Sequence, residues 1–355
     1  MVMARRPEVK TASASVSAID TLGLAQQMVN ALARVPFRAL PGCYDSRVGR
    51  FGASVTREVV RSFMGYCAAL PIEEFRSLEL LLDDLCQVVM APVVALQRVT
   101  MVPDTIGGVP GVWYRPRGSR PPGQIFYIHG GGHIGTSPTM YAYFTAVLTN
   151  VTGCEVFVSD YRLAPEFPFP AGLEDAVAVA RALLERDLPA DRLVVAGDSG
   201  GAGTACSLMY EFRALNLPRP GGLVLFSPEA DLRLDQPSVT QNAAKDILPW
   251  NIPTSPFLHG TDPGAAIVSA IDQDVECWPP TLVAYGQDEM LRDSIRILVQ
   301  HLRNAEVDTV SIEAPGMFHV FPILMPWAAA SRDVQAELGR FVRGHLGHGG
   351  ERVDE

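Results

Sequence analysis

Apolar positions in the second two-thirds of the chain fall in short runs. From about Leu96 onward, β-branched and aromatic residues cluster between Gly, Pro and Asp, which is the pattern of strands. Several runs are continuously apolar, as expected where both faces of a parallel sheet are covered. The runs that predict strands are 112–114, 125–128, 156–159, 193–196, 223–226, 282–285 and 309–312.

Helical patterns alternate with these runs. Apolar residues three and four apart over 173–184 and 291–302 predict helices, and 204–214 is compatible with another. Strands that alternate with helices are typical of the α/β class. We therefore expect a mostly parallel central sheet with helices on both faces.

Two segments stand outside this alternation. Helical patterns precede the first strand, so we expect residues 1–90 to form an N-terminal arm and cap helices. Residues 229–278 are rich in Pro, contain aromatic residues and lack a strand pattern; they are too long for a structureless loop and predict a cap insertion. The α/β core then comprises 91–228 and 279–346, and we expect 347–355 to be a disordered tail.

Composition and charge exclude several classes of protein. Of 355 residues, 48% are hydrophobic and 19% charged, unlike disordered, collagen-like or coiled-coil chains. The formal charge of −10 disfavours nucleic acid and anionic lipid as partners. Six cysteines without a C-x-x-C pair favour reduced thiols. No apolar run reaches ~18 residues and no secretory signal is apparent, so we expect a cytoplasmic protein without stable membrane anchoring.

The strongest local motif is Gly197-Asp198-Ser199-Gly200-Gly201, directly after a predicted strand and before a helical run. A serine at such a sharp turn has a strained backbone, and glycines two positions away avoid collisions with it. The helix N-terminus also favours developing negative charge. The motif predicts a nucleophilic Ser199, whereas the alternative is a glycine-rich loop that happens to contain serine.

A serine hydroxyl needs a base to remove its proton, and a third group to orient that base. His319 follows the last predicted strand, where active sites of α/β proteins gather. In the chain order typical of this fold class, the acid follows the strand 282–285. Asp288 and Glu289 both stand there, and the residues alone leave the choice between them open.

The run His129-Gly130-Gly131-Gly132 follows another predicted strand. Acyl transfer builds an oxyanion, which exposed backbone N–H groups stabilise, and glycines let the backbone approach the substrate. We expect these donors to be Gly131, Gly132 and Gly200. His129 is expected to shape the loop by hydrogen bonding rather than to act as an acid or base.

Together these motifs resemble the hormone-sensitive-lipase-like family of α/β-hydrolase esterases, over roughly 124–320. The matching stretches are HGGG at 129–132, DYRLAPE at 160–166, FPA at 169–171, GDSGG at 197–201 and MFHVF at 317–321. The resemblance implies the α/β-hydrolase fold with a cap built from N-terminal helices and an insertion. It also implies Glu289 rather than Asp288 as the acid, and hydrolysis of short- to medium-chain carboxylic esters without a cofactor.

Two residues depart from the family pattern. His133 stands where an aromatic residue usually follows HGGG, which is expected to alter the acyl or alcohol pocket. Gly200 stands where alanine is usual, which should matter little because its backbone N–H is the working group. Neither departure removes a member of the expected triad.

We therefore expect a serine carboxylesterase acting on a small-molecule ester through Ser199, His319 and Glu289. An amidase, a lactonase or a thioesterase would use the same triad. A non-catalytic ligand receptor on this fold would be expected to lose the nucleophile or the histidine, and this chain keeps both. A homodimer is compatible with the sequence.

A dinucleotide-binding oxidoreductase is the competitor from another class. A G-x-G-x-x-G pattern followed by an acidic residue after the next strand imitates an NAD(P) fingerprint; it comprises Gly130, Gly132, Gly135 and Asp160. Pro138 interrupts the helix that should follow, and the serine and histidine would have no role, so this interpretation is disfavoured. No metal site is predicted, because the glycines between His129 and His133 disfavour a helical ligand pair.

Overall fold

The computed structural model describes residues 18–35, 47–118, 121–186, 189–249, 252 and 254–346. Within them, eight strands form one sheet in the order β1-β2-β4-β3-β5-β6-β7-β8. The strands are β1 Val99–Ile106, β2 Val109–Pro116, β3 Gln124–Ile128, β4 Glu155–Ser159, β5 Leu193–Asp198, β6 Gly222–Phe226, β7 Thr281–Gly286 and β8 Thr309–Ala314. Only β2 pairs antiparallel, with β1 and β4, so the expected mostly parallel sheet is confirmed.

The apolar pattern gives no signal for β1. Pro103 and Asp104 interrupt the apolar pattern but not the strand, because β1 pairs only with β2 at the edge of the sheet, where proline is tolerated. The Asp104 carboxylate accepts a hydrogen bond from the indole N–H of Trp113 at 2.9 Å, which links β1 to β2 through their side chains.

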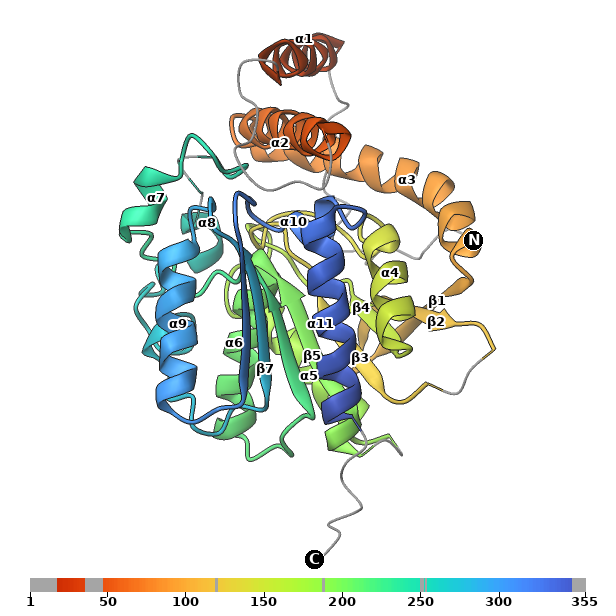
Figure 1. Ribbon diagram of the computed structural model, residues 1–355, viewed down its shortest axis with the longest axis vertical. Helices are drawn as coiled ribbons and strands as arrows, with labels where there is room; N and C mark the ends of the chain where they lie inside the picture. Colours follow the sequence, from red (N-terminus) through yellow and green to blue (C-terminus); the bar gives the residue numbers. More distant parts are fainter. Residues whose placement is uncertain are drawn as a thin grey trace, which may run out of the picture.

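Helices cover both faces of the sheet (Figure 1). They are α1 Ala18–Arg34, α2 Arg47–Cys67, α3 Ile72–Leu96, α4 Ala142–Thr152, α5 Ala171–Leu184, α6 Ser199–Ala214, α7 Pro237–Gln241, α8 Ser255–Leu258, α9 Arg292–Asn304, α10 Phe321–Leu324 and α11 Ala329–His345, with 3₁₀ turns η3 Ala190–Arg192 and η4 Ala270–Asp272. The predicted helices over 173–184 and 291–302 correspond to α5 and α9. No helix within the described ranges is long and apolar enough to cross a bilayer.

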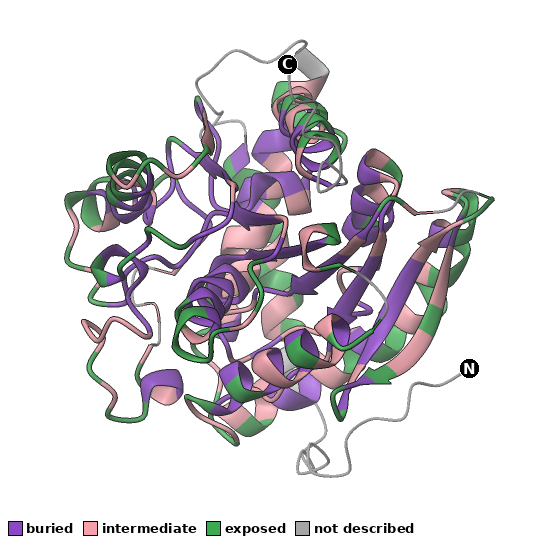
Figure 2. Cartoon of the chain, turned by 90° about the horizontal axis from the view of Figure 1, so that it is seen from below, coloured by how far each residue is buried: buried purple, intermediate pink, exposed green. Residues whose placement is uncertain are grey.

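Alternating side chains of β3 separate the two layers of core. Phe126 and Ile128 pack in the cluster that includes α5, α6 and α9. Ile125 and Tyr127 point the other way, into the cluster that includes α4 and α11. Figure 2 shows the central strands buried and the exposed positions on the outer sides of the helices. Burial on both faces explains the continuous apolar runs in the sequence.

The two segments interpreted as a cap lie at one end of the sheet. Helices α1, α2 and α3 lie together there (Figure 1), and 229–278 contains α7, α8 and η4. Arg61 of α2 donates hydrogen bonds to the backbone carbonyls of Ala243 and Asp246, which joins the N-terminal helices to the insertion. The expected tail, 347–355, lies outside the described residues.

A buried arginine fastens α3 to the segment that carries DYRLAPE. The guanidinium of Arg76 donates to both carboxylate oxygens of Glu166, at 3.0 and 2.7 Å, and to Glu79 at 2.7 Å. It also donates to the backbone carbonyls of Ile134 and Ala164. Burial raises the pKa of Glu79 to about 7, although Arg76 opposes that rise. One cation therefore holds a helix of the N-terminal segment against two loops of the α/β core.

Replacing this arginine should destabilise the protein. In Arg76→Met the buried Glu79 and the half-buried Glu166 lose their partner, and we expect a loss of about 3–5 kcal/mol in the free energy of unfolding. Urea denaturation followed by circular dichroism measures it. As a control, Arg340→Met removes an exposed pair with Glu337 and should change stability little. Equal effects of the two variants would contradict the assigned role of Arg76.

Candidate active site

Ser199 lies at a sharp turn between β5 and α6. Its backbone φ of 51° lies in the left-handed region, which residues other than glycine rarely adopt. A Cβ at Gly201 would lie 2.2 Å from the carbonyl oxygen of Ile128, and one at Gly197 would lie 2.8 Å from that of Gly201. Both glycines are therefore required by close backbone contacts. The turn projects the serine side chain from the carboxyl end of β5, at the start of a helix.

The structure brings together three residues that are remote in the chain. The Ser199 hydroxyl lies 2.8 Å from Nε2 of His319, and Nδ1 of His319 lies 2.9 Å from Oε2 of Glu289. The His319 side chain is 2% exposed and that of Glu289 is fully buried. With Nδ1 protonated, His319 donates to Glu289 and accepts the serine proton at Nε2, which is the arrangement that a serine nucleophile requires.

Asp288, the other candidate acid, points elsewhere. Its carboxylate lies 3.2 Å from the ammonium group of Lys245. Its backbone N–H donates to the carbonyl of Met317 at 2.9 Å, which fixes the turn after β7. Within the described residues, Glu289 is therefore the carboxylate in line with His319.

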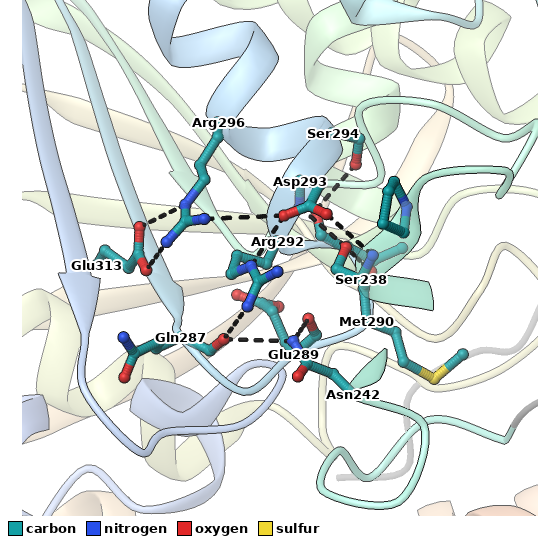
Figure 3. A network of polar contacts seen from close by, with 12 residues as sticks. Ser238, Asn242, Gln287, Glu289, Met290, Arg292, Asp293, Ser294, Arg296 and Glu313 are labelled. Carbon is teal, nitrogen blue, oxygen red and sulfur yellow. Dashed lines mark hydrogen bonds and ion pairs between the residues drawn. The ribbon is translucent and has the colours of Figure 1, made fainter. Parts of the chain in front are cut away.

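Neighbouring loops hold Glu289 in place. Its Oε1 accepts hydrogen bonds from the N–H of Gly286 at 2.6 Å and from the Ser227 hydroxyl at 3.3 Å. Its backbone carbonyl accepts from the Asn242 side chain at 2.9 Å (Figure 3). The same network ties Asp293, at the start of α9, to the N–H of Ser238. The insertion thus braces the loop that carries the acid.

Asp246, also in the insertion, fixes the histidine. Its carboxylate accepts the backbone N–H groups of His319 at 2.9 Å and of Met290 at 2.6 Å. Burial alone would lower the pKa of His319, but the hydrogen bond and charge of Glu289 outweigh it and raise the pKa. The imidazole is therefore placed to accept a proton and to keep it while negative charge develops nearby.

A buried carboxylate, Asp198, anchors the HGGG loop. It accepts hydrogen bonds from the Gly130 N–H at 2.9 Å and from the hydroxyls of Tyr127 and Tyr141, each at 2.8 Å. Burial raises the pKa of Asp198 to about 6. Tyr141 also accepts from the Gly130 N–H, at 3.1 Å. The residue before the serine therefore fixes the loop that faces it.

His129 lies inside this loop and makes local hydrogen bonds. Its Nδ1 is 2.9 Å from the carbonyl of Gly130 and 2.8 Å from the Thr136 hydroxyl. Among the described residues, no hydrogen bond occupies the N–H groups of Gly131 and Gly132. The N–H of Gly200 lies in the first turn of α6, where such groups lack an intrahelical acceptor. These three donors are available to a bound anion.

The geometry disfavours dinucleotide binding at the same loop. A dinucleotide fingerprint needs a helix that opens at its last glycine, so that the helix N-terminus meets the pyrophosphate. Turns occupy the chain after Gly135, and α4 begins only at Ala142. In the described part of the chain, no cluster of three or more His, Cys, Asp or Glu could hold a metal ion.

Local sequence does not reveal the role of several residues of the site. Asp198 lies within a recognised motif, but its partners are distant in the chain. Ser227 follows β6 directly, so the rule that sites gather at the carboxyl ends of parallel strands could have identified it. Asp246 lies in a segment without regular secondary structure, and no local pattern marks it.

The chain is similar to several known proteins. The family model for the alpha/beta hydrolase fold matches residues 125–323. An acetyl-hydrolase of Streptomyces hygroscopicus is 35% identical over 250 residues, which cover 69% of this chain and 83% of that protein. A putative acetyl-hydrolase of Mycobacterium tuberculosis, LipR, is 31% identical over 253 residues, covering 68% of this chain and 80% of that protein.

A solved structure is similar as well. The crystal structure of an esterase from the bacterial hormone-sensitive lipase family superposes with a TM-score of 0.73 and 28% identity, covering 82% of this chain and 98% of that one. The chain therefore belongs to the α/β-hydrolase family, in its hormone-sensitive-lipase-like branch. It is an enzyme of the carboxylic ester hydrolase class, so the predicted fold and family are confirmed.

The anchoring of the HGGG loop can be tested with two tyrosines. Tyr127→Phe and Tyr141→Phe each remove one donor from buried Asp198, and each should lower the free energy of unfolding by about 1–3 kcal/mol. Only Tyr141 also contacts Gly130. Tyr141→Phe should therefore lower kcat for ester hydrolysis by about tenfold more than Tyr127→Phe, equivalent to ~1.4 kcal/mol in the transition state. Equal kcat values in the two variants would show that the loop does not depend on this contact.

Proposed function

We propose that this protein is a serine carboxylesterase that hydrolyses short- to medium-chain carboxylic esters with Ser199, His319 and Glu289 as its triad. The observation that supports it most is the unbroken line of hydrogen bonds from the serine hydroxyl through the imidazole to a fully buried carboxylate. The left-handed turn at Ser199 adds to this support, because backbone strain of this kind is typical of a nucleophile at a strand-to-helix turn.

In the acylation step, His319 removes the hydroxyl proton as Oγ of Ser199 attacks the ester carbonyl carbon. The carbonyl oxygen becomes an oxyanion, which the N–H groups of Gly131, Gly132 and Gly200 stabilise. The bond to the alcohol oxygen then breaks, and the alcohol takes the proton from His319. The acyl group remains bound to the serine.

In the deacylation step, water attacks the acyl carbonyl and gives its proton to His319. The second tetrahedral intermediate collapses, the acid leaves, and Ser199 regains its proton. Glu289 stabilises the imidazolium in both steps and keeps the imidazole in the correct tautomer. Asp246 contributes by fixing the backbone of the histidine.

The names of the relatives support a small acyl group, since two of them are an acetyl-hydrolase and a putative acetyl-hydrolase. An amidase, a lactonase or a thioesterase would use the same residues, so rates on matched amide, lactone and thioester substrates discriminate among them. The intact line of hydrogen bonds disfavours a non-catalytic receptor. The cytoplasmic location and the homodimer stay predictions.

Removing the nucleophile or the base should abolish the reaction. Ser199→Ala and His319→Ala are each expected to lower kcat/KM for p-nitrophenyl acetate by about 10⁴-fold or more. Stopped-flow or plate absorbance measures the release of p-nitrophenol. In the wild type, a fluorophosphonate should attach to Ser199, as located by mass spectrometry. Turnover within tenfold of the wild type in either variant would overturn the assignment.

The two adjacent acids provide a matched comparison. Glu289→Gln should lower kcat by about 10³–10⁴-fold, because the amide no longer stabilises the imidazolium. Asp288→Asn should lower it by less than about tenfold, because it loses only a half-exposed pair with Lys245. Kinetics on the same ester measure both. A larger loss in Asp288→Asn would move the acid by one position.

A further inference from the structure

A second carboxylate reaches the nucleophile. Glu229 lies three residues after β6, and its Oε1 is 3.5 Å from the Ser199 hydroxyl. Its backbone N–H donates to the carbonyl of Ser199 at 3.1 Å. The side chain is 7% exposed. Glu229 thus contacts Ser199 through both its side chain and its backbone.

The other oxygen of this carboxylate is held by a fixed imidazole. Oε2 of Glu229 lies 3.3 Å from Nε2 of His133, whose side chain is also buried. The ring of His133 stacks on Phe257 of α8, with centroids 3.6 Å apart and planes 8° from parallel. Its Nδ1 lies 3.4 Å from the Thr204 hydroxyl. The loop that carries HGGG and the insertion therefore position the carboxylate together.

This arrangement connects the two departures from the family pattern. A Cβ at position 200 would lie 3.0 Å from the ring of His133, tighter than an ordinary contact. Glycine at this position gives the imidazole its space. His133, Gly200 and Glu229 therefore form one cluster beside Ser199, and the two departures are structurally linked.

We propose that Glu229 is a second carboxylate of the catalytic centre, which stabilises the protonated form of His319 and accepts the Ser199 hydroxyl when that form is present. The inference rests on the proposed function. Oε1 of Glu229 and Nε2 of His319 contact the same Ser199 hydroxyl, at 3.5 and 2.8 Å. The carboxylate and the imidazole are therefore close neighbours. When Nε2 of His319 holds a proton it cannot accept one, and the carboxylate is then the remaining acceptor.

The charges around both groups are consistent with this role. His319 faces Glu289 at Nδ1 and Asp246 at its backbone N–H, and it also interacts electrostatically with Asp198 and Glu229. Glu229 faces His133, with Tyr161 nearby. Burial alone would raise the pKa of Glu229, but the hydrogen bond and charge of His133 outweigh it and lower the pKa. Glu229 is therefore ionised at neutral pH.

The pH dependence of kcat/KM tests the proposal. Its acidic limb reports the pKa of the free histidine, and an adjacent negative charge raises that pKa. Glu229→Gln keeps the shape and removes the charge, so the limb should move to lower pH by about one unit. Glu229→Asp keeps the charge and should leave the limb in place even if kcat falls. Glu276→Gln removes an exposed carboxylate outside the site and is the control for net charge.

Phenyl acetate hydrolysis between pH 4 and 9 would be measured for all four proteins, with folding checked by circular dichroism. A limb that stays in place in folded Glu229→Gln overturns the inference, while an active wild type leaves the proposed function standing. A wild type that neither hydrolyses esters nor reacts with a fluorophosphonate overturns both.

A second variant covers the case in which Glu229→Gln does not fold. His133→Asn removes the partner of Glu229, and asparagine tolerates the left-handed φ of 61° at this position. Without the hydrogen bond and charge of His133, burial favours the neutral form of Glu229 and raises the pKa of its carboxyl group. The limb should move to lower pH here too, and an unmoved limb in this variant also overturns the inference.

Discussion

The close approach of α6 to the end of β3 is the constraint on which the site depends. Gly201 packs against the backbone carbonyls of Ile128 and His129, at a distance that excludes any side chain. This contact forces the left-handed turn at Ser199 and places the serine beside the HGGG loop. The hydrogen bond from the Gly130 N–H to Asp198 then holds the loop to the turn. The proposed nucleophile and the proposed anion-binding backbone are thus positioned by one packing arrangement.

The other side chains of the site lie together because the strands that precede them are parallel. The chain leaves β6, β7 and β8 at the same edge of the sheet as β5, so the loops after them carry Ser227, Glu289 and His319 to one place. The insertion contributes Asp246 to the backbone of the histidine, and α2 holds that part of the insertion through Arg61. The segments outside the α/β core therefore complete the site rather than only cover it.

Much of this could be predicted from the sequence, because the relevant signals are local. Short runs of β-branched and aromatic residues marked seven of the eight described strands, and the serine motif is defined by steric conditions within one turn. The local sequence does not decide whether Asp288 or Glu289 contacts the histidine. That choice depends on the N–H of Asp288 reaching Met317 and that of Gly286 reaching Glu289, which only the packed loops decide.

Residues such as Asp198, Asp246 and Glu229 act through partners that lie far away in the chain, and no spacing reveals such pairs. The edge strand β1 was not predicted for another reason. An edge strand tolerates the proline and polar residues that a central strand excludes, so its sequence lacks the apolar pattern of a strand. One helix boundary also differs from the expectation: α3 continues through Pro92 to Leu96, beyond residue 90, where the N-terminal cap helices were expected to end.

The central claim is that Ser199, His319 and the HGGG loop act on one carbonyl group. A crystal structure of the protein after reaction with an alkyl phosphonate tests it most directly. We expect a phosphorus bonded to Oγ of Ser199, a phosphoryl oxygen within hydrogen-bonding distance of the N–H groups of Gly131, Gly132 and Gly200, and His319 still hydrogen-bonded to Glu289. A phosphonate on another residue, or a phosphoryl oxygen directed away from that loop, would contradict it.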